Sequence, residues 1–148
     1  MTAVFGTLNF DRHVPVAASR VFSALVSPED RMAWGPPDTG SIVVITDQPA
    51  PAEGVRELSK CGPRDNPYVD VATDWVLIDA PRRLIFAETL LAEGEILGTS
   101  LATYELTEAS GGTDLRLTVQ LVNFAGEEMM GEFEGGWTHA LNNLTAHF

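Results

Sequence analysis

The sequence predicts an α+β protein in which a curved antiparallel sheet of six to seven strands wraps around one long C-terminal helix. Two observations support this: successive strand-like segments are joined by short turn sequences, and one long amphipathic segment follows them. A sheet this wide exceeds the diameter of a single helix, roughly 10 Å with side chains. The sheet therefore has to curl around the helix, and curling leaves room for a cavity between the two layers.

The first segment, residues 4–16, reads as a strand that is closed by Pro15 and a run of small residues. An amphipathic helix is predicted from residue 17, because apolar residues then recur at spacings of three and four. These residues are Val21, Phe22, Leu25 and Val26.

A second short helix is predicted directly after the first. Ser27 is a typical N-cap, Pro28 suits the first helical position, and Asp30 three residues later completes a capping box. Gly35 and the two prolines after it end this helix. Two short helices therefore follow the first strand.

The middle of the chain holds six further strand-like segments, separated by turns rich in Gly, Pro, Asp and Asn. They cover residues 41–46, 54–61, 68–78, 84–91, 97–107 and 113–122. In the last segment, apolar and polar residues alternate regularly. This alternation is typical of a sheet with one buried face and one face in water.

The chain ends in a predicted helix from about residue 127, whose apolar residues form one stripe. The stripe consists of Met129, Met130, Phe133, Trp137, Ala140, Leu141, Leu144 and Phe148. On a helical wheel Gly131 and Gly135 lie opposite the stripe and Gly136 flanks it. Each glycine costs about 1 kcal/mol relative to alanine in a helix interior. Either the helix starts later than residue 127, or its N-terminal half moves to admit a ligand.

The chain has 148 residues and a formal net charge of -12, from 9 basic and 21 acidic residues. Its length suits a single domain over residues 1–148. Phosphate binding needs clustered Lys and Arg, and only Arg82 and Arg83 are adjacent, so nucleic acid is not an expected partner. The negative charge also disfavours anionic membrane surfaces, and no apolar run is long enough to span a bilayer, so no membrane insertion is expected.

Cys61 is the only cysteine, which fits a reducing compartment, and we expect a buried or half-buried thiol in a strand.

Residues 1–10 lack the basic and apolar parts of a signal peptide, so a cytoplasmic location is expected. The three histidines show no zinc-site spacing, and the sequence contains no glycine-rich phosphate-binding motif. The sequence assigns no catalytic residue, no metal ligand and no cofactor.

Several short motifs, in this order and spacing, resemble those of one superfamily. They are Arg20-Val21-Phe22-Ser23-Ala24-Leu25, Ser27-Pro28-Glu29, Trp34-Gly35-Pro36, Asp79-Ala80-Pro81-Arg82-Arg83-Leu84-Ile85-Phe86, Gly111-Gly112-Thr113-Asp114-Leu115, Glu134-Gly135-Gly136-Trp137 and Leu141-Asn142-Asn143-Leu144. Over nearly its whole length the chain resembles the START-like (SRPBCC) superfamily, in the branch named for the activator of the Hsp90 ATPase. The resemblance implies the helix-grip fold and hydrophobic ligand binding. It does not imply one activity, because members include carriers, cyclases, lipid-transfer proteins and co-chaperone domains.

Met129, Phe133 and Trp137 are the first candidates for a ligand-binding wall. Aromatic rings and adaptable methionines suit a pocket for flat or apolar molecules. The alternative is that this part of the stripe belongs to the packed core. Both alternatives stay open on the sequence.

Glu88 is the main polar candidate, and its orientation depends on the strand register. If Leu84 and Phe86 face inward, Glu88 also faces inward, and an apolar pocket would raise the pKa of its carboxyl. Such a carboxyl can bind a polar ligand group or exchange a proton. If Ile85 and Ala87 face inward instead, Glu88 is a surface charge, and this second register is the one we favour.

Tyr104 shares strand parity with Leu106 and can present its phenol to the cavity. Trp34, Trp75 and Arg56 are weaker candidates, each better explained by a structural role. The predicted ligand-binding residues are Trp34, Trp75, Phe86, Glu88, Tyr104, Met129, Phe133 and Trp137.

Three functions remain open on the sequence. The favoured one is binding or carrying of a small hydrophobic or aromatic molecule between the sheet and the C-terminal helix, without catalysis. The first alternative is an enzyme for a small cyclic or aromatic substrate, using Glu88, Arg56 or Tyr104. The second alternative is a co-chaperone-like protein-interaction domain. A homodimer and a chaperone partner are both compatible with the sequence.

Overall fold

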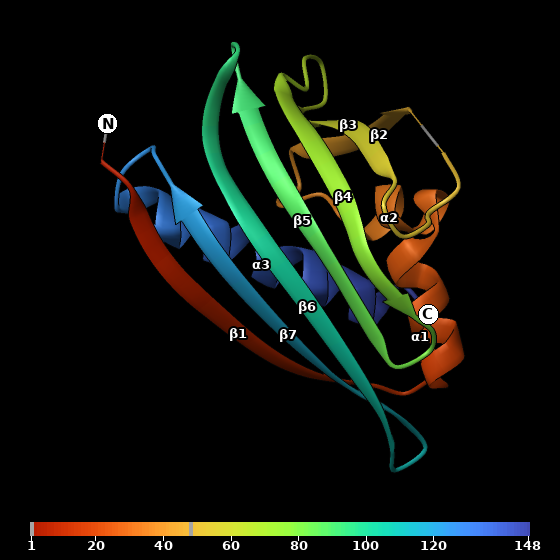
Figure 1. The fold of residues 1–148 in the computed structure, drawn as a ribbon. Helices are drawn as coiled ribbons and strands as arrows, with labels where there is room; N and C mark the ends of the chain where they lie inside the picture. Colours follow the sequence, from red (N-terminus) through yellow and green to blue (C-terminus); the bar gives the residue numbers. More distant parts are fainter. Residues whose placement is uncertain (1, 48) are drawn as a thin grey trace.

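In the computed structural model, residues 2–47 and 49–148 are described, and they form seven strands and three helices (Figure 1). Their order is the predicted one: a strand, two short helices, six strands and a long helix. The elements are β1 Val4–Val14, α1 Ala18–Val26, α2 Pro28–Trp34, β2 Ser41–Asp47, β3 Arg56–Pro63, β4 Val69–Asp79, β5 Arg83–Ala92, β6 Glu95–Ala109, β7 Gly112–Asn123 and α3 Glu128–Ala146.

The strands form one sheet in the order β1-β7-β6-β5-β4-β3-β2, and every neighbouring pair is antiparallel. From β2 to β7 each strand pairs with the next in sequence, as expected for segments joined by tight turns. The first strand then pairs with the last. The predicted antiparallel α+β fold with two short helices and a long C-terminal helix is confirmed.

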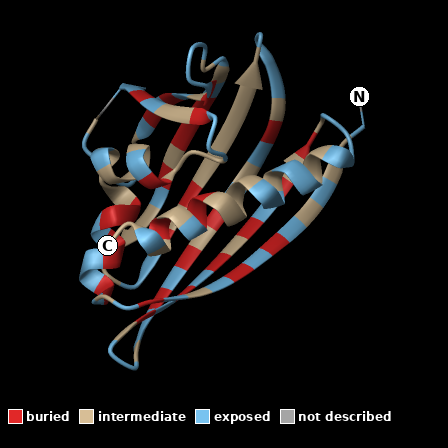
Figure 2. Ribbon diagram, turned by 180° about the vertical axis from the view of Figure 1, so that it is seen from behind, coloured by how far each residue is buried: buried red, intermediate tan, exposed pale blue. Residues whose placement is uncertain are grey.

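Helix α3 crosses the concave face of the curved sheet, and α1 and α2 close one end (Figures 1 and 2). The C-terminal half of α3 packs into the core through Ala140, Leu141 and Leu144, which are buried. In its N-terminal half no residue is fully buried. Gly6 on β1 gives room to this half, because a side chain there would occupy the place of the Met130 methyl group. Helix α3 therefore contributes fully buried residues to the core only from its C-terminal half.

Helix α3 begins at Glu128, so a later start is not the reason for its three glycines. The alternative, a half-helix that moves to admit a ligand, stays a prediction. The first strand ends at Val14 rather than at residue 16, because Pro15 lacks an N–H and Val16 turns back to bond the Val14 carbonyl at 2.8 Å.

The predicted capping box of α2 forms only in part. Ser27 Oγ accepts a hydrogen bond from the Asp30 backbone N–H at 3.4 Å, and Pro28 occupies the first turn, as predicted. The reciprocal bond is missing, because the Ser27 N–H donates to the Ser23 carbonyl of α1. The Asp30 carboxylate is thereby free to bond elsewhere, and it bonds His147.

Candidate functional site

A cavity of about 630 Å³ lies between the sheet, α2 and the N-terminal half of α3. Strands β2 to β7 and all three helices contribute to its walls. The cavity exists because one helix cannot cover a seven-stranded sheet, and only the C-terminal half of α3 contains fully buried residues. Its size falls within the range of small-molecule sites, about 300–1,000 Å³.

All eight residues of the predicted ligand-binding set line this cavity. They are Trp34, Trp75, Phe86, Glu88, Tyr104, Met129, Phe133 and Trp137. Within the C-terminal stripe, Phe133 and Trp137 line the cavity and also pack against the core, while Leu141 and Leu144 are buried in the core alone. Contact of these eight residues with a ligand stays a prediction.

The opening of the cavity is marked by lining residues that are also exposed: Asp38, Tyr68, Glu132 and Gly135. Gly135, expected on the side of α3 away from the stripe, is exposed and has open space where a side chain would begin. Gly136 also lines the cavity, and a Cβ added there would lie 3.1 Å from the Pro37 Cβ. The opening therefore lies where α3 passes the segment after α2.

A polar row crosses the concave face of the sheet. Glu57 pairs with Thr73, Thr73 with Glu88, and Glu88 with Ser100, on the neighbouring strands β3 to β6. Because paired residues point to the same face, all four side chains line the cavity. In the next row toward the core, Trp75 pairs with Phe86 and Phe86 with Ala102. The cavity thus has an apolar wall with a polar stripe beside it.

Arg31 and Glu57 form a buried ion pair at one end of this row. Arg31 lies on α2 and its Nη2 is 2.5 Å from Glu57 Oε2, with side-chain exposures of 13% and 3%. The guanidinium carbon also lies 5.0 Å from the centre of the Trp75 ring. Burial raises the pKa of Glu57 and lowers that of Arg31, and in each case the partner's charge opposes the change. Each charge therefore helps to keep the other ionised inside the protein.

The Glu88 carboxyl faces the cavity, so the register that we favoured on the sequence, with Glu88 at the surface, is wrong. Leu84 and Phe86 are buried, and strand alternation turns Glu88 to the same side. Burial raises the pKa of Glu88 to about 7; Arg31 opposes the rise and Glu57 adds to it. No described residue donates a hydrogen bond to this carboxyl, in contrast to Glu57.

Four further polar atoms of the cavity wall have no hydrogen-bond partner among the described residues: the Tyr104 hydroxyl, the Trp75 indole N–H, Arg31 Nε and Glu57 Oε1. Burial and the nearby Glu88 raise the pKa of Tyr104, so its phenol stays protonated. The rings of Trp75 and Phe86 pack edge-on at 5.5 Å, and Phe86 and Tyr104 lie 6.3 Å apart. The cavity thus combines an aromatic cluster with unpartnered donors.

The sequence did not identify Arg31 and Glu57, and it proposed Arg56 instead. Arg56 lies on the outer face of β3, where its Nε bonds Asp74 at 2.7 Å, so it is outside the cavity. The signal for Glu57 was present: it shares strand parity with Cys61, for which we expected burial. Arg31 carried no such signal, because its position depends on how α2 packs against the sheet.

Cys61 lines the cavity as a half-buried thiol in a strand, as predicted. Burial raises its pKa to about 11, and the carboxylates of Glu88 and Asp38 contribute to the rise. A protonated thiol is a poor nucleophile. The chemistry of the cavity therefore rests on its carboxyls.

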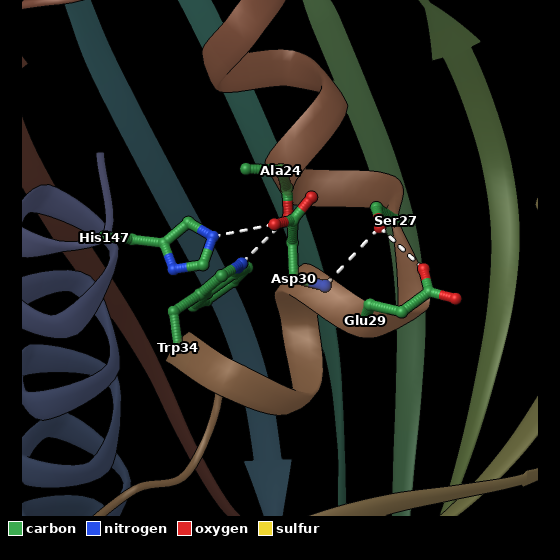
Figure 3. A network of polar contacts seen from close by, with 6 residues as sticks. All are labelled: Ala24, Ser27, Glu29, Asp30, Trp34 and His147. Carbon is green, nitrogen blue, oxygen red and sulfur yellow. Dashed lines mark hydrogen bonds and ion pairs between the residues drawn. The ribbon is translucent and has the colours of Figure 1, made fainter.

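The position of α2, and so of Arg31, is fixed by a network of polar contacts with α1 and α3 (Figure 3). The Trp34 indole N–H donates to the Ala24 carbonyl at 2.8 Å, and His147 Nε2 lies 2.7 Å from Asp30 Oδ1. The hydrogen bond with His147 is the largest influence on the Asp30 carboxyl and lowers its pKa, while burial opposes this. Contacts outside the cavity thus hold one of its charged residues in place.

A second hollow, of about 570 Å³, lies on the outer face of β1, β6 and β7. Its walls are exposed ion pairs such as Asp11 with Arg116, which water screens, so it is the weaker site.

No three or more His, Cys, Asp or Glu side chains within residues 2–47 and 49–148 gather closely enough to hold a metal ion. In the same part of the chain, no helix is both long and apolar enough to cross a membrane.

The curved sheet, the helix across it and the cavity between them define a helix-grip protein of the START-like superfamily. Within it the chain belongs to the family described as Activator of Hsp90 ATPase homolog 1-like protein, whose model matches residues 15–148. No curated protein matches the chain.

Three solved structures illustrate the likeness. Mll3558 from Rhizobium loti is 24% identical, with a TM-score of 0.86 and full coverage of both chains. CV1439 from Chromobacterium violaceum is 19% identical with a TM-score of 0.81, covering 95% of this chain and 94% of its own. Ms6760 from Mycobacterium smegmatis is 21% identical with a TM-score of 0.72, covering 95% and 88%. At these identities the likeness concerns the fold.

Proposed function

We propose that this protein binds a small, largely apolar molecule that carries one polar group. The observation that supports this most directly is the Glu88 carboxyl, which faces an aromatic-walled cavity and accepts no hydrogen bond from residues 2–47 and 49–148. A buried polar group without a hydrogen bond is costly, and a ligand that satisfies it recovers that cost. The apolar body of the ligand packs against the aromatic wall, while its polar group meets the row of Glu57, Thr73, Glu88 and Ser100.

The proposal is tested by calorimetric titration with naphthalene-2-methanol, an aromatic molecule with a single hydroxyl group. We expect saturable binding by the wild type and loss of binding in Ser100→Phe, which fills the cavity. The matched control is Leu101→Phe, one residue along on the outer face of β6, which should bind like the wild type. Equal binding by both variants would place the ligand elsewhere and contradict the proposal. A wild-type chain that binds no member of an aromatic and lipid library would also contradict it.

One observation favours enzymatic turnover as a second candidate. Burial raises the pKa of Glu88 to about 7, so this carboxyl can exchange a proton with a bound molecule near neutral pH. The Tyr104 hydroxyl and Arg31 line the same cavity. Screening of small cyclic and aromatic substrates would test this. Turnover should follow an ionisation near pH 7 and disappear in Glu88→Gln, and turnover that persists in this variant would exclude the role.

A further inference from the structure

We propose that the ligand of this cavity is an organic cation: an aromatic or aliphatic molecule whose polar group is a protonated amine held against Glu88. This inference rests on the proposed binding function and specifies its ligand class. It follows from the balance of charges around the cavity and from the chemistry of its walls.

Carboxylates outnumber cations among the residues that line the cavity. The charged lining residues are Arg31, Asp38, Glu57, Glu88 and Glu132. The single cation, Arg31, already donates to Glu57 at 2.5 Å. One guanidinium cannot neutralise two carboxylates, so the interior carries an excess negative charge whenever Glu88 is ionised. A ligand cation removes that excess.

The strand geometry keeps Arg31 from serving both interior acids equally. Glu57 and Glu88 lie on β3 and β5, in one row with Thr73 of β4 between them. Strands are about 4.8 Å apart, so the backbones of the two acids are roughly 10 Å apart. Arg31 bonds the nearer one, and the Glu88 carboxyl is left as an acceptor that faces open space in the cavity.

The aromatic walls suit the same ligand class. A cation is attracted to the face of an aromatic ring, and Arg31 already lies over the Trp75 ring. Further rings of the wall come from Trp34, Phe86, Tyr104, Phe133 and Trp137. An amine with an apolar body can therefore satisfy Glu88 and contact the rings together.

The charges at the opening of the cavity also favour a cationic ligand. Asp38 and Glu132 are exposed beside it, and the chain as a whole carries a net charge of -12. Such a field attracts cations and repels anions as they approach. An anionic ligand would face repulsion at the opening and again at Glu88.

The Glu88 proton competes with the bound cation. The groups that face Glu88 are Arg31 of α2, Glu57 and Cys61 of β3, and Tyr104 of β6; of these only Arg31 is positive. A bound amine is a second positive neighbour and favours the ionised carboxylate. Binding near pH 7 should therefore release a proton, and the affinity should fall as the pH is lowered.

The test compares three ligands that share one ring system: 2-naphthylmethylammonium, naphthalene-2-methanol and 2-naphthoate. At pH 8 we expect the cation to bind about tenfold or more tightly than the alcohol, with the anion weakest. In Glu88→Gln the cation should lose this advantage, while binding of the alcohol changes little. The control Glu134→Gln removes a carboxylate of α3 that does not line the cavity, and should leave all three affinities unchanged.

The outcomes separate this inference from the proposed function. Equal binding of cation and alcohol, or tighter binding of the anion, would overturn the cation inference and leave the binding function standing. An advantage of the cation that persists in Glu88→Gln would also overturn it. Failure of all three ligands to bind would contradict the proposed function itself. A folding control, the thermal unfolding of each variant by circular dichroism, confirms that the comparison concerns folded protein.

Discussion

Glu57 and Glu88 face the same cavity from the same row of the sheet, yet their surroundings differ. Glu57 is 2% exposed and bonded to Arg31, so its charge is compensated within the protein. Glu88 has the open cavity in front of it and no hydrogen-bond donor among the described residues. The first acid is part of the structure, and the second is available to a ligand.

The Arg31–Glu57 pair should be strongly coupled in folding stability. Arg31→Met leaves the Glu57 charge buried without a partner, which costs about 3–5 kcal/mol of the free energy of unfolding. Adding Glu57→Leu should recover most of that loss, because the carboxylate that had lost its partner is then removed as well. Equilibrium unfolding in urea measures both variants. The control is Arg56→Met, which breaks the exposed pair with Asp74 and should cost far less; a similar loss in both single variants would contradict this account.

At the scale of elements, α2 joins the rest of the fold to the cavity. Its Trp34 bonds α1 and its Asp30 bonds His147 just after α3 (Figure 3). Its Arg31 lines the cavity. The Asn143 side chain of α3 adds a bond to the Trp34 carbonyl at 3.3 Å. These contacts hold the short helix α2 in place and lie outside the cavity. Substitutions at these contacts should therefore alter the stability of the cavity wall that α2 provides.

His147→Ala should cost about 1 kcal/mol of folding stability, since it removes a hydrogen bond to a partly buried carboxylate. The contact lowers the pKa of Asp30 in the folded chain, so its contribution is present above the ordinary value of 3.8 and is lost as the pH falls below it. Urea unfolding at pH 6 and pH 3 measures the difference between wild type and variant. His139→Ala on α3 is the control, and a pH-independent difference would show that the contact acts without the Asp30 charge.

At the scale of the whole molecule, the cavity follows from the mismatch between a wide sheet and one helix. Figure 2 shows α3 spanning the concave face, with buried residues concentrated on the strands beneath it and around α1. Toward β2 and β3 the walls are polar as well as apolar, and two interior carboxyls have raised pKa values. Ionisation of these interior carboxyls is therefore less favourable in the folded chain than in water.

Stability should therefore fall as the pH rises from about 5 to 8. The pKa of Glu88 rises from its ordinary value of 4.5 to about 7 on folding, so in this range the folded chain holds a proton that the unfolded chain has lost. The full shift corresponds to about 3 kcal/mol, and water in the open cavity should reduce this to about 1–3 kcal/mol. Urea unfolding of wild type and Glu88→Gln at both pH values measures it. The variant should lose less stability than the wild type, and equal losses would contradict the assignment.

The sequence by itself determined the order of elements and the antiparallel sheet, and it named three residues of the C-terminal stripe as candidates for the cavity wall. These depend on local spacing: alternation along strands, the Ser27–Pro28 helix start, and the stripe of Met129, Phe133 and Trp137. Such patterns follow from the period of a strand or helix, which neighbouring residues carry without information from distant ones.

Only the tertiary structure decided which face of β5 carries Glu88 and which cation meets Glu57. Both faces of β5 offer apolar residues, so its own alternation could not choose the register, and pairing with β4 and β6 settled it. Arg31 and Glu57 are 26 residues apart and meet because α2 packs against β2, from where the Arg31 side chain reaches β3. The physical reason is that burial and charge pairing depend on distances across the fold, which local spacing does not contain.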